Sequence, residues 1–169
     1  MNQDSFRAFY GQTATALLAY LAHVTGDSSA AEDLMQECYL RILKANLPET
    51  MDDVHRRYYL FRIGANLVKD RFRLMRREGK IPKTEPAAPD TTKSFALRDL
   101  VDSAFVRLRP QDRQLLWLAY AEELSHKEIA TITGYRAASV RPLLSQAKRR
   151  LATVVRSILG TDKNANSIL

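Results

Sequence analysis

A proline-rich stretch near the middle of the chain is the feature that most limits its possible folds. Residues 79–95 read GKIPKTEPAAPDTTKSF and hold three of the six prolines. The stretch has no apolar period and its prolines favour extended backbone, so it predicts a flexible linker. Each flanking piece has roughly 75 residues, near the lower size for an independently stable core. We therefore expect two small domains, at residues 1–78 and 96–160, with a tail at 161–169 and a larger partner that holds the domains together.

Both flanking pieces are predicted to be all-α. Hydrophobic residues make up 46% of the sequence and glycines are few, which favours helices over a sandwich or barrel. The start, MNQDSF, lacks the pattern of a secretory signal, and the longest apolar run, LLWLAYA at 115–121, is too short to span a bilayer. The single cysteine, Cys38, excludes an internal disulfide and fits a reducing compartment. We expect a cytoplasmic chain with no membrane span.

The first half reads as three helices. The first is predicted from Ser5 to Val24, with Asp4 as N-cap and Gly26 at the stop. The second follows Ser29, which forms a capping box with a glutamate three residues later. The third runs from Asp53 to Arg77. Its predicted buried stripe consists of Leu60, Ile63, Leu67 and Leu74.

The second half predicts a four-helix domain with a helix-turn-helix. Pro110 opens a helix, where its fixed φ is tolerated. Ser125 and Glu128 make a capping box, and Gly134 allows the sharp turn before a long last helix. The helix before Pro110 is predicted to bury one face, made of Leu97, Leu100, Val101, Ala104 and Leu108.

Charge indicates that the last helix contacts nucleic acid. From Ile129 to Thr161 the sequence has no acid and six bases, Arg136, Arg141, Lys148, Arg149, Arg150 and Arg156. Such residues contact phosphates, while side chains near the start of a recognition helix read base edges. A basic, solvated helical hairpin that binds no DNA is the alternative.

Pro142 complicates this last helix, because an interior proline costs about 3 kcal/mol. Either the helix begins late, near Arg141, or it begins on schedule at Ala137 and kinks. We expect both to re-aim the reading side chains.

The front of the chain has the opposite charge. Residues 1–54 carry eight acids and three bases, a net charge of −5, which leaves +12 for the remainder of a chain whose total is +7. This asymmetry indicates two partners of opposite character.

A further basic face is predicted on the third helix. Tyr59, Arg62, Asn66, Lys69 and Arg73 recur at helical spacing opposite the leucine stripe. An aromatic ring, an amide and three cations suit single-stranded DNA, and Tyr58 and Phe61 add aromatic surface. The alternative is that Tyr59 and Phe61 belong to the core and the arginines are only solvated.

Four segments of the chain resemble the bacterial sigma-70 family, in its extracytoplasmic-function (ECF) type. The segments are AEDLMQECYLRI, YYLFRIGANLVKDRFR, LRPQDRQLLWLAYAEELSHKEIA and GYRAASVRPLLSQAKRRL. The resemblance covers nearly the whole chain outside the linker and the last residues. It implies two helical domains, a non-enzymatic role in transcription initiation, and no cofactor.

The resemblance also implies partners and site residues. The polar face of the second helix, Asp33, Gln36, Glu37 and Arg41, would dock on the β′ clamp helices of core RNA polymerase, with the β flap as a further contact. The third-helix residues Tyr59, Phe61, Arg62, Asn66, Lys69 and Arg73 would hold the melted minus-ten strand, and the loop from Asn46 to Arg57 would capture a flipped base. The minus-thirty-five element would be read by Arg136, Ser139, Arg141, Ser145, Lys148 and Arg149. An anti-sigma factor is the expected regulator.

Three rival functions are weighed against this interpretation. The first is a free-standing dimeric regulator, and the second is a sigma-like decoy that sequesters an anti-sigma protein; Pro142 favours the decoy. The third is an enzyme, which the sequence disfavours because its three histidines are scattered and no glycine-rich phosphate loop is present.

The sequence departs from the usual pattern of the sigma-70 family at Arg136, Pro142, Leu143 and Tyr59.

Overall fold

The structure, a computed structural model, describes residues 1–80 and 97–165, with side chains described as far as residue 160. These residues form seven helices and no strand, which confirms the all-α fold. The predicted linker, apart from Gly79 and Lys80, lies outside the described residues.

The first half is a three-helix unit. The helices are α1 (Gln3–Thr25), α2 (Ser28–Lys44) and α3 (Asp53–Arg77), and each packs against the other two. Gly26 ends α1 in the left-handed conformation at φ 70°, as the sequence predicts. The bounds of α3 are those predicted.

Two predicted N-caps are wrong. Asn2, and not Asp4, caps α1 by accepting from the Ser5 amide at 2.8 Å. Asp27 caps α2 through the Ala30 amide at 3.0 Å, so the predicted capping box at Ser29 does not form. The N-cap is the last residue with extended backbone before the helix, and in α2 this residue is Asp27. Ser29 therefore lies inside the helix.

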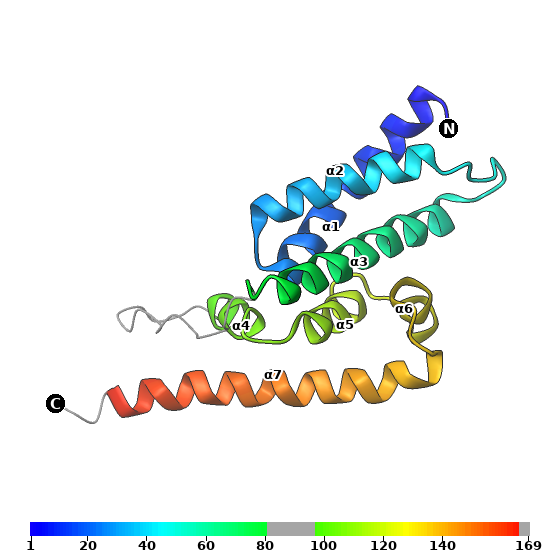
Figure 1. The fold of residues 1–169 in the computed structure, drawn as a ribbon. Helices are drawn as coiled ribbons and strands as arrows, with labels where there is room; N and C mark the ends of the chain where they lie inside the picture. Colours follow the sequence, from blue (N-terminus) through cyan, green and yellow to red (C-terminus); the bar gives the residue numbers. More distant parts are fainter. Residues whose placement is uncertain (81–96, 166–169) are drawn as a thin grey trace.

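The second half contains α4 (Leu97–Phe105), α5 (Pro110–Tyr120), α6 (His126–Thr133) and α7 (Ala137–Ala165). Figure 1 shows α4, α5 and α6 lying between α3 and the long α7, and α7 packs on all three. Pro110 is at the start of α5, as predicted. α7 continues to Ala165, past the boundary predicted at residue 160.

The buried stripes are partly different from those predicted. Leu60, Ile63 and Leu67 are buried, but Leu74 is exposed because α3 extends beyond the core there. Ala104 of α4 and Leu108, which follows the helix, are buried, whereas Leu97 is 77% exposed and Val101 is also exposed. The short α4 packs chiefly on α7, so only its last turn reaches the core.

The two halves pack directly against each other, with α1 on α5 and α3 on α6. We call this contact the seam. Arg113 of α5 is buried and donates to the Val24 carbonyl at 3.2 Å and to the Leu108 carbonyl at 2.9 Å. Gln114 donates to the Tyr20 hydroxyl at 2.7 Å. Buried contacts therefore join the two halves directly in this structure.

Candidate nucleic-acid and docking interfaces

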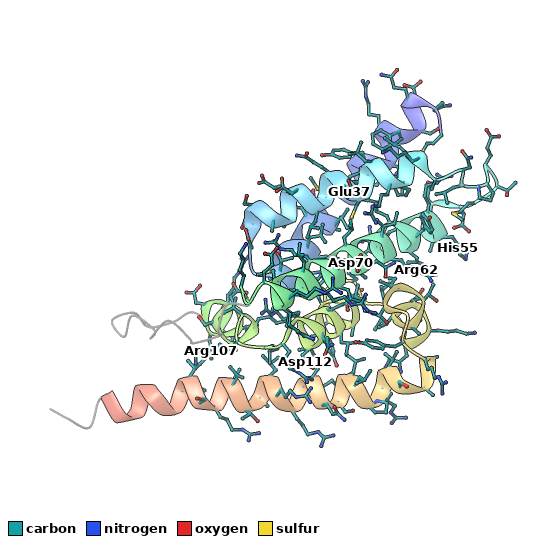
Figure 2. All side chains as sticks on the ribbon, in the orientation of Figure 1. Glu37, His55, Arg62, Asp70, Arg107 and Asp112 are labelled. Atoms are coloured by element: carbon teal, nitrogen blue, oxygen red, sulfur yellow. The ribbon has the colours of Figure 1, made fainter. Side chains whose placement is uncertain are left out.

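The polar face of α2 is open to solvent. Asp33, Gln36 and Arg41 are exposed, and Glu37 is half-buried. Glu37 accepts from the Arg41 guanidinium at 2.7 Å, so these two charges largely neutralise each other (Figure 2 labels Glu37). Asp33 is left as the acid of this face with no such partner among the described ion pairs.

Two leucines on the same face of α2 were missed in the sequence. Leu40 and Leu43 are 50% and 47% exposed. Leu40 follows Asp33 by seven residues and Leu43 follows Gln36 by seven, so each leucine shares a side of the helix with a polar residue. We call Asp33, Gln36, Leu40 and Leu43 the α2 surface. It places apolar contact area beside charged and polar groups, as surfaces that dock on other proteins do. This spacing was the signal in the sequence.

The predicted basic face of α3 is also solvent-accessible. Arg62, Asn66, Lys69 and Arg73 are exposed and Tyr59 is half-buried. We call these five residues the α3 face. Arg73 lies 3.6 Å from Asp70, an exposed pair that water screens. Figure 2 shows Arg62 on the stretch of α3 that runs beside α6.

Phe61 does not lie on this exposed face, contrary to the prediction that it adds aromatic surface there. Its side chain is 1% exposed, and its ring centroid lies 5.3 Å from that of Tyr20 in α1. The Arg57 guanidinium covers the ring at 5.2 Å. Phe61 is a core residue because α3 turns it towards α1, which is the alternative the sequence left open. Its neighbour Tyr59 is only half-buried.

The loop before α3 is held by its own hydrogen bonds. The Asp52 carboxylate accepts from the His55 amide at 2.8 Å and contacts the His55 Nδ1 at 2.7 Å. These bonds, the amide bond first, lower the pKa of Asp52. Arg56 donates to the Met51 carbonyl at 2.9 Å and to Asp53 at 2.7 Å. The end of the predicted base-capturing loop is thus anchored to the first turn of α3.

A groove of about 820 Å³ runs along the seam. One wall carries Asn66, Lys69 and Arg73 of the α3 face, and Arg109 and Gln111 of the second half lie on the other. Cations on both walls favour an anionic occupant.

The helix-turn-helix is built as the sequence predicts. The Glu128 amide donates to Ser125 Oγ at 3.3 Å and the Ser125 amide donates to Glu128 at 2.7 Å, which completes the capping box. Gly134 takes the left-handed conformation at φ 80° and ends α6. Because a side chain other than glycine is strained there, Gly134 sets the direction in which α7 begins.

The predicted minus-thirty-five residues lie along the first half of α7. Arg136, at the entry to the helix, is exposed, as are Arg141, Ser145, Lys148 and Arg149, whereas Ser139 is half-buried. The Lys148 ammonium lies 5.4 Å from the Tyr120 ring centroid. We call these six residues the α7 face.

Pro142 lies inside α7, which begins on schedule at Ala137. Of the two alternatives, the late start near Arg141 is therefore wrong. Proline has no N–H, so the Ala138 carbonyl lacks its usual helical donor. This carbonyl stands between Arg136 and Arg141.

Arg150 has a structural partner instead of being a free cation of α7. It donates to Asp112 Oδ1 at 2.9 Å, and Arg109 donates to Asp112 Oδ2 at 2.9 Å. Asp112 is 2% exposed, and Figure 2 shows it between α5 and α7. The hydrogen bond that Arg109 donates to Asp112 also raises the pKa of Arg109. This triad fixes α7 on α5.

No group of three or more potential metal-ligating side chains occurs within residues 1–80 and 97–160. Within the helices that the structure describes, none is long and apolar enough to cross a bilayer.

Both halves of the chain match family models of known proteins. The family model for Sigma-70 region 2 matches residues 9–78, and the model for region 4 matches residues 98–151. The ECF RNA polymerase sigma factor SigL of Mycobacterium tuberculosis is 29% identical over 160 residues, which cover 90% of this chain and 89% of SigL. The sigma factor EcfG of Rhodopseudomonas palustris is 27% identical over 157 residues, 90% of this chain and 86% of EcfG.

A solved structure has the same fold. It is the sigma factor RpoE in complex with the anti-sigma factor NepR from Bartonella quintana, with a TM-score of 0.71 and 21% identity. The match covers 90% of this chain and 97% of the solved chain.

Proposed function

Because this chain belongs to the sigma-70 family of RNA polymerase sigma factors, in its ECF type, we propose that it binds core RNA polymerase and directs promoter recognition and melting. It would act in the cytoplasm, where the polymerase is, and without catalysis or a cofactor of its own.

The observation that carries this proposal is the separation of three exposed surfaces on one chain. The α2 surface, with exposed leucines beside Asp33 and Gln36, suits a protein partner. The α3 face and the α7 face are basic and suit nucleic acid. A free-standing regulator needs the α7 face alone, whereas a polymerase subunit that opens promoters needs all three.

Each surface has an assigned partner in the proposal. The α2 surface docks on the β′ clamp helices, and the second half contacts the β flap. The α3 face, with the loop before it, holds the melted minus-ten strand, since strand capture offsets part of the cost of unpairing. The α7 face reads the minus-thirty-five element. Tethering both DNA contacts on polymerase raises the effective concentration of the second contact.

Control by an anti-sigma factor is part of the proposal. The structural relative from Bartonella quintana was solved with such a factor bound. A partner of that kind would cover the α2 surface or the two DNA faces and so prevent initiation.

The experiment is run-off transcription with purified core polymerase and candidate promoters. We expect the wild-type chain to give promoter-dependent transcripts and the Asp33→Ala/Gln36→Ala variant to lose at least about tenfold of them, which corresponds to about 1.4 kcal/mol of docking energy. Gln3→Ala/Asp4→Ala removes the same two residue types from the exposed first turn of α1 and serves as the matched control. A wild-type chain that binds an anti-sigma factor but never starts transcription would favour the decoy.

A further inference from the structure

Two acids of the second half hold the start of α3. Glu122, which follows α5, accepts from the Arg57 guanidinium at 2.5 Å. Glu128, in the first turn of α6, accepts a hydrogen bond from the Tyr58 hydroxyl. The Glu122 side chain is only 9% exposed, so this is not a loose surface pair. Both contacts join residues more than sixty positions apart in sequence.

The acceptors resemble the groups that a nucleic acid presents. An arginine guanidinium and a tyrosine hydroxyl are common donors to phosphate oxygens, and here carboxylate oxygens occupy those donors. Arg57 ends the predicted base-capturing loop, and Tyr58 adjoins the α3 face. The acids therefore lie where the negatively charged strand would come.

Glu128 is fixed for this role by the capping box. One of its carboxylate oxygens accepts from the Ser125 amide at 2.7 Å and the other from Tyr58. The bond from Tyr58 comes first among the causes that lower the pKa of Glu128, and the same bond raises the pKa of Tyr58. The other polar groups at this contact are Arg57, Glu122, Ser125, Asp52 and His55, whose ring lies edge-on to Tyr58 with centroids 6.3 Å apart.

The rest of the seam keeps the second half beside the α3 face, across the groove. α5 forms the far wall of the groove lined by Asn66, Lys69 and Arg73. Arg113 and Gln114 attach α5 to α1, and the rings of His23 and Trp117 stack with centroids 4.1 Å apart.

This closed arrangement is incompatible with simultaneous reading of both promoter elements. Elements at positions minus ten and minus thirty-five lie about 25 base pairs apart, or about 85 Å of straight duplex. Arg136 follows Glu128 by eight residues, which span at most about 28 Å. Because Glu128 touches Tyr58, the first residues of the α7 face lie within roughly that distance of the α3 face.

We propose that Glu122 and Glu128 form an acidic latch that closes the free chain by occupying Arg57 and Tyr58 in place of the minus-ten strand. The latch must open before the chain can read a promoter. The DNA half of this inference rests on the proposed function, but the closure itself does not. Docking of the α2 surface on a larger partner, which leaves the second half free to bind elsewhere, would favour the open form.

The test compares the wild-type chain with Glu122→Gln/Glu128→Gln. Glutamine at position 128 still completes a capping box, so α6 keeps its start. Asp99→Asn/Asp102→Asn changes the net charge equally at two exposed acids of α4 and is the matched control. This control matters because any loss of negative charge strengthens DNA binding somewhat.

Closure is measured first, on the full chain without DNA or polymerase. Fluorophores on Glu32→Cys and Arg156→Cys report the separation of α2 and α7 by energy transfer. Both positions are exposed, and the native Cys38 is fully buried, which directs the labels. We expect lower transfer efficiency in the latch variant and no change in the control. Equal efficiency in the latch variant and the wild type would overturn the latch, whatever the polymerase assays show.

Strand binding is measured second, by fluorescence anisotropy with a single-stranded oligonucleotide of a candidate minus-ten non-template sequence. We expect the latch variant to bind at least about tenfold more tightly than the control variant. If the latch variant opens without binding the strand more tightly, the claim that the acids occupy the place of the strand is wrong. The claim that the two acids close the free chain would still hold. Loss of run-off transcription with intact closure would instead count against the proposed function.

Discussion

The imidazole of His23 stacks on the indole of Trp117 with ring centroids 4.1 Å apart and an interplanar angle of 26°. His23 lies near the end of α1 and Trp117 in the middle of α5, so the stack joins the two halves of the chain. Trp117 is the single tryptophan of the sequence, and its fluorescence reports directly on the seam.

Removal of the imidazole is expected to expose the indole. In His23→Ala, one face of Trp117 gains water, so its emission should shift to the red and the free energy of unfolding should fall by about 0.5–1.5 kcal/mol. Emission spectra and urea titrations measure the two effects. His126→Ala, at an exposed histidine of α6, should change neither. An unshifted spectrum in His23→Ala would show that the stack is absent in solution.

Asp112→Asn is expected to loosen α7 from α5. The change leaves Arg109 and Arg150 without the buried carboxylate that accepts from both. Removing one partner from such a pair costs several kcal/mol when all groups are buried. Since both arginines are partly exposed, we expect a loss of about 2 kcal/mol in the free energy of unfolding, measured in urea. Asp102→Asn should cost less than about 0.5 kcal/mol. Equal unfolding curves for the two variants would contradict this role.

Pro142 is expected to affect both stability and reading. Pro142→Ala restores the donor to the Ala138 carbonyl and should stabilise α7 by up to about 3 kcal/mol, as measured by thermal unfolding. Pro142→Ser should alter promoter binding by re-aiming Arg136, Ser139 and Arg141 more than it changes the phosphate contacts of Lys148 or Arg149. Footprints of identical pattern and strength for the wild type and Pro142→Ser would refute this.

Cys38 is expected to be unreactive in the folded chain. Burial raises the pKa of its thiol from 9.0 to about 12. The reactive thiolate is therefore scarce at pH 8, and alkylation should need unfolding. The unfolded chain can lose this proton from about pH 9 upwards, so the contribution of Cys38 to stability is complete below pH 9 and is lost as the pH rises towards 12. Alkylation in native buffer, followed by mass spectrometry, checks this. Rapid native labelling would contradict the buried position.

Local rules predicted those parts of the fold that local chemistry decides. Gly26, Pro110, Gly134 and the Ser125–Glu128 box each act within one turn of their own helix, and the structure has all of them as predicted. The N-cap of α2 was predicted wrongly because two nearby residues can both cap a helix. Asp27 and Ser29 differ only in their position relative to the turn, and Asp27 takes the cap.

Features that depend on contacts between distant segments could not be predicted from periodicity. Phe61 has the same spacing as a surface residue until α1 is placed over it. Arg113 and Arg150 look like solvated cations until α1 and Asp112 supply their partners. The α2 surface could be predicted only in part. Its leucines recur at helical spacing in the sequence, but the sequence does not show that their side chains are exposed.

Binding of purified core polymerase tests the central claim most directly. Tagged wild-type chain, Asp33→Ala/Gln36→Ala and Gln3→Ala/Asp4→Ala are each incubated with core polymerase in mild salt and recovered on the tag. We expect the wild type and the α1 variant to retain the polymerase and the α2 variant to lose most of it. No retention by the wild-type chain, or equal retention by all three, would contradict docking through the α2 surface.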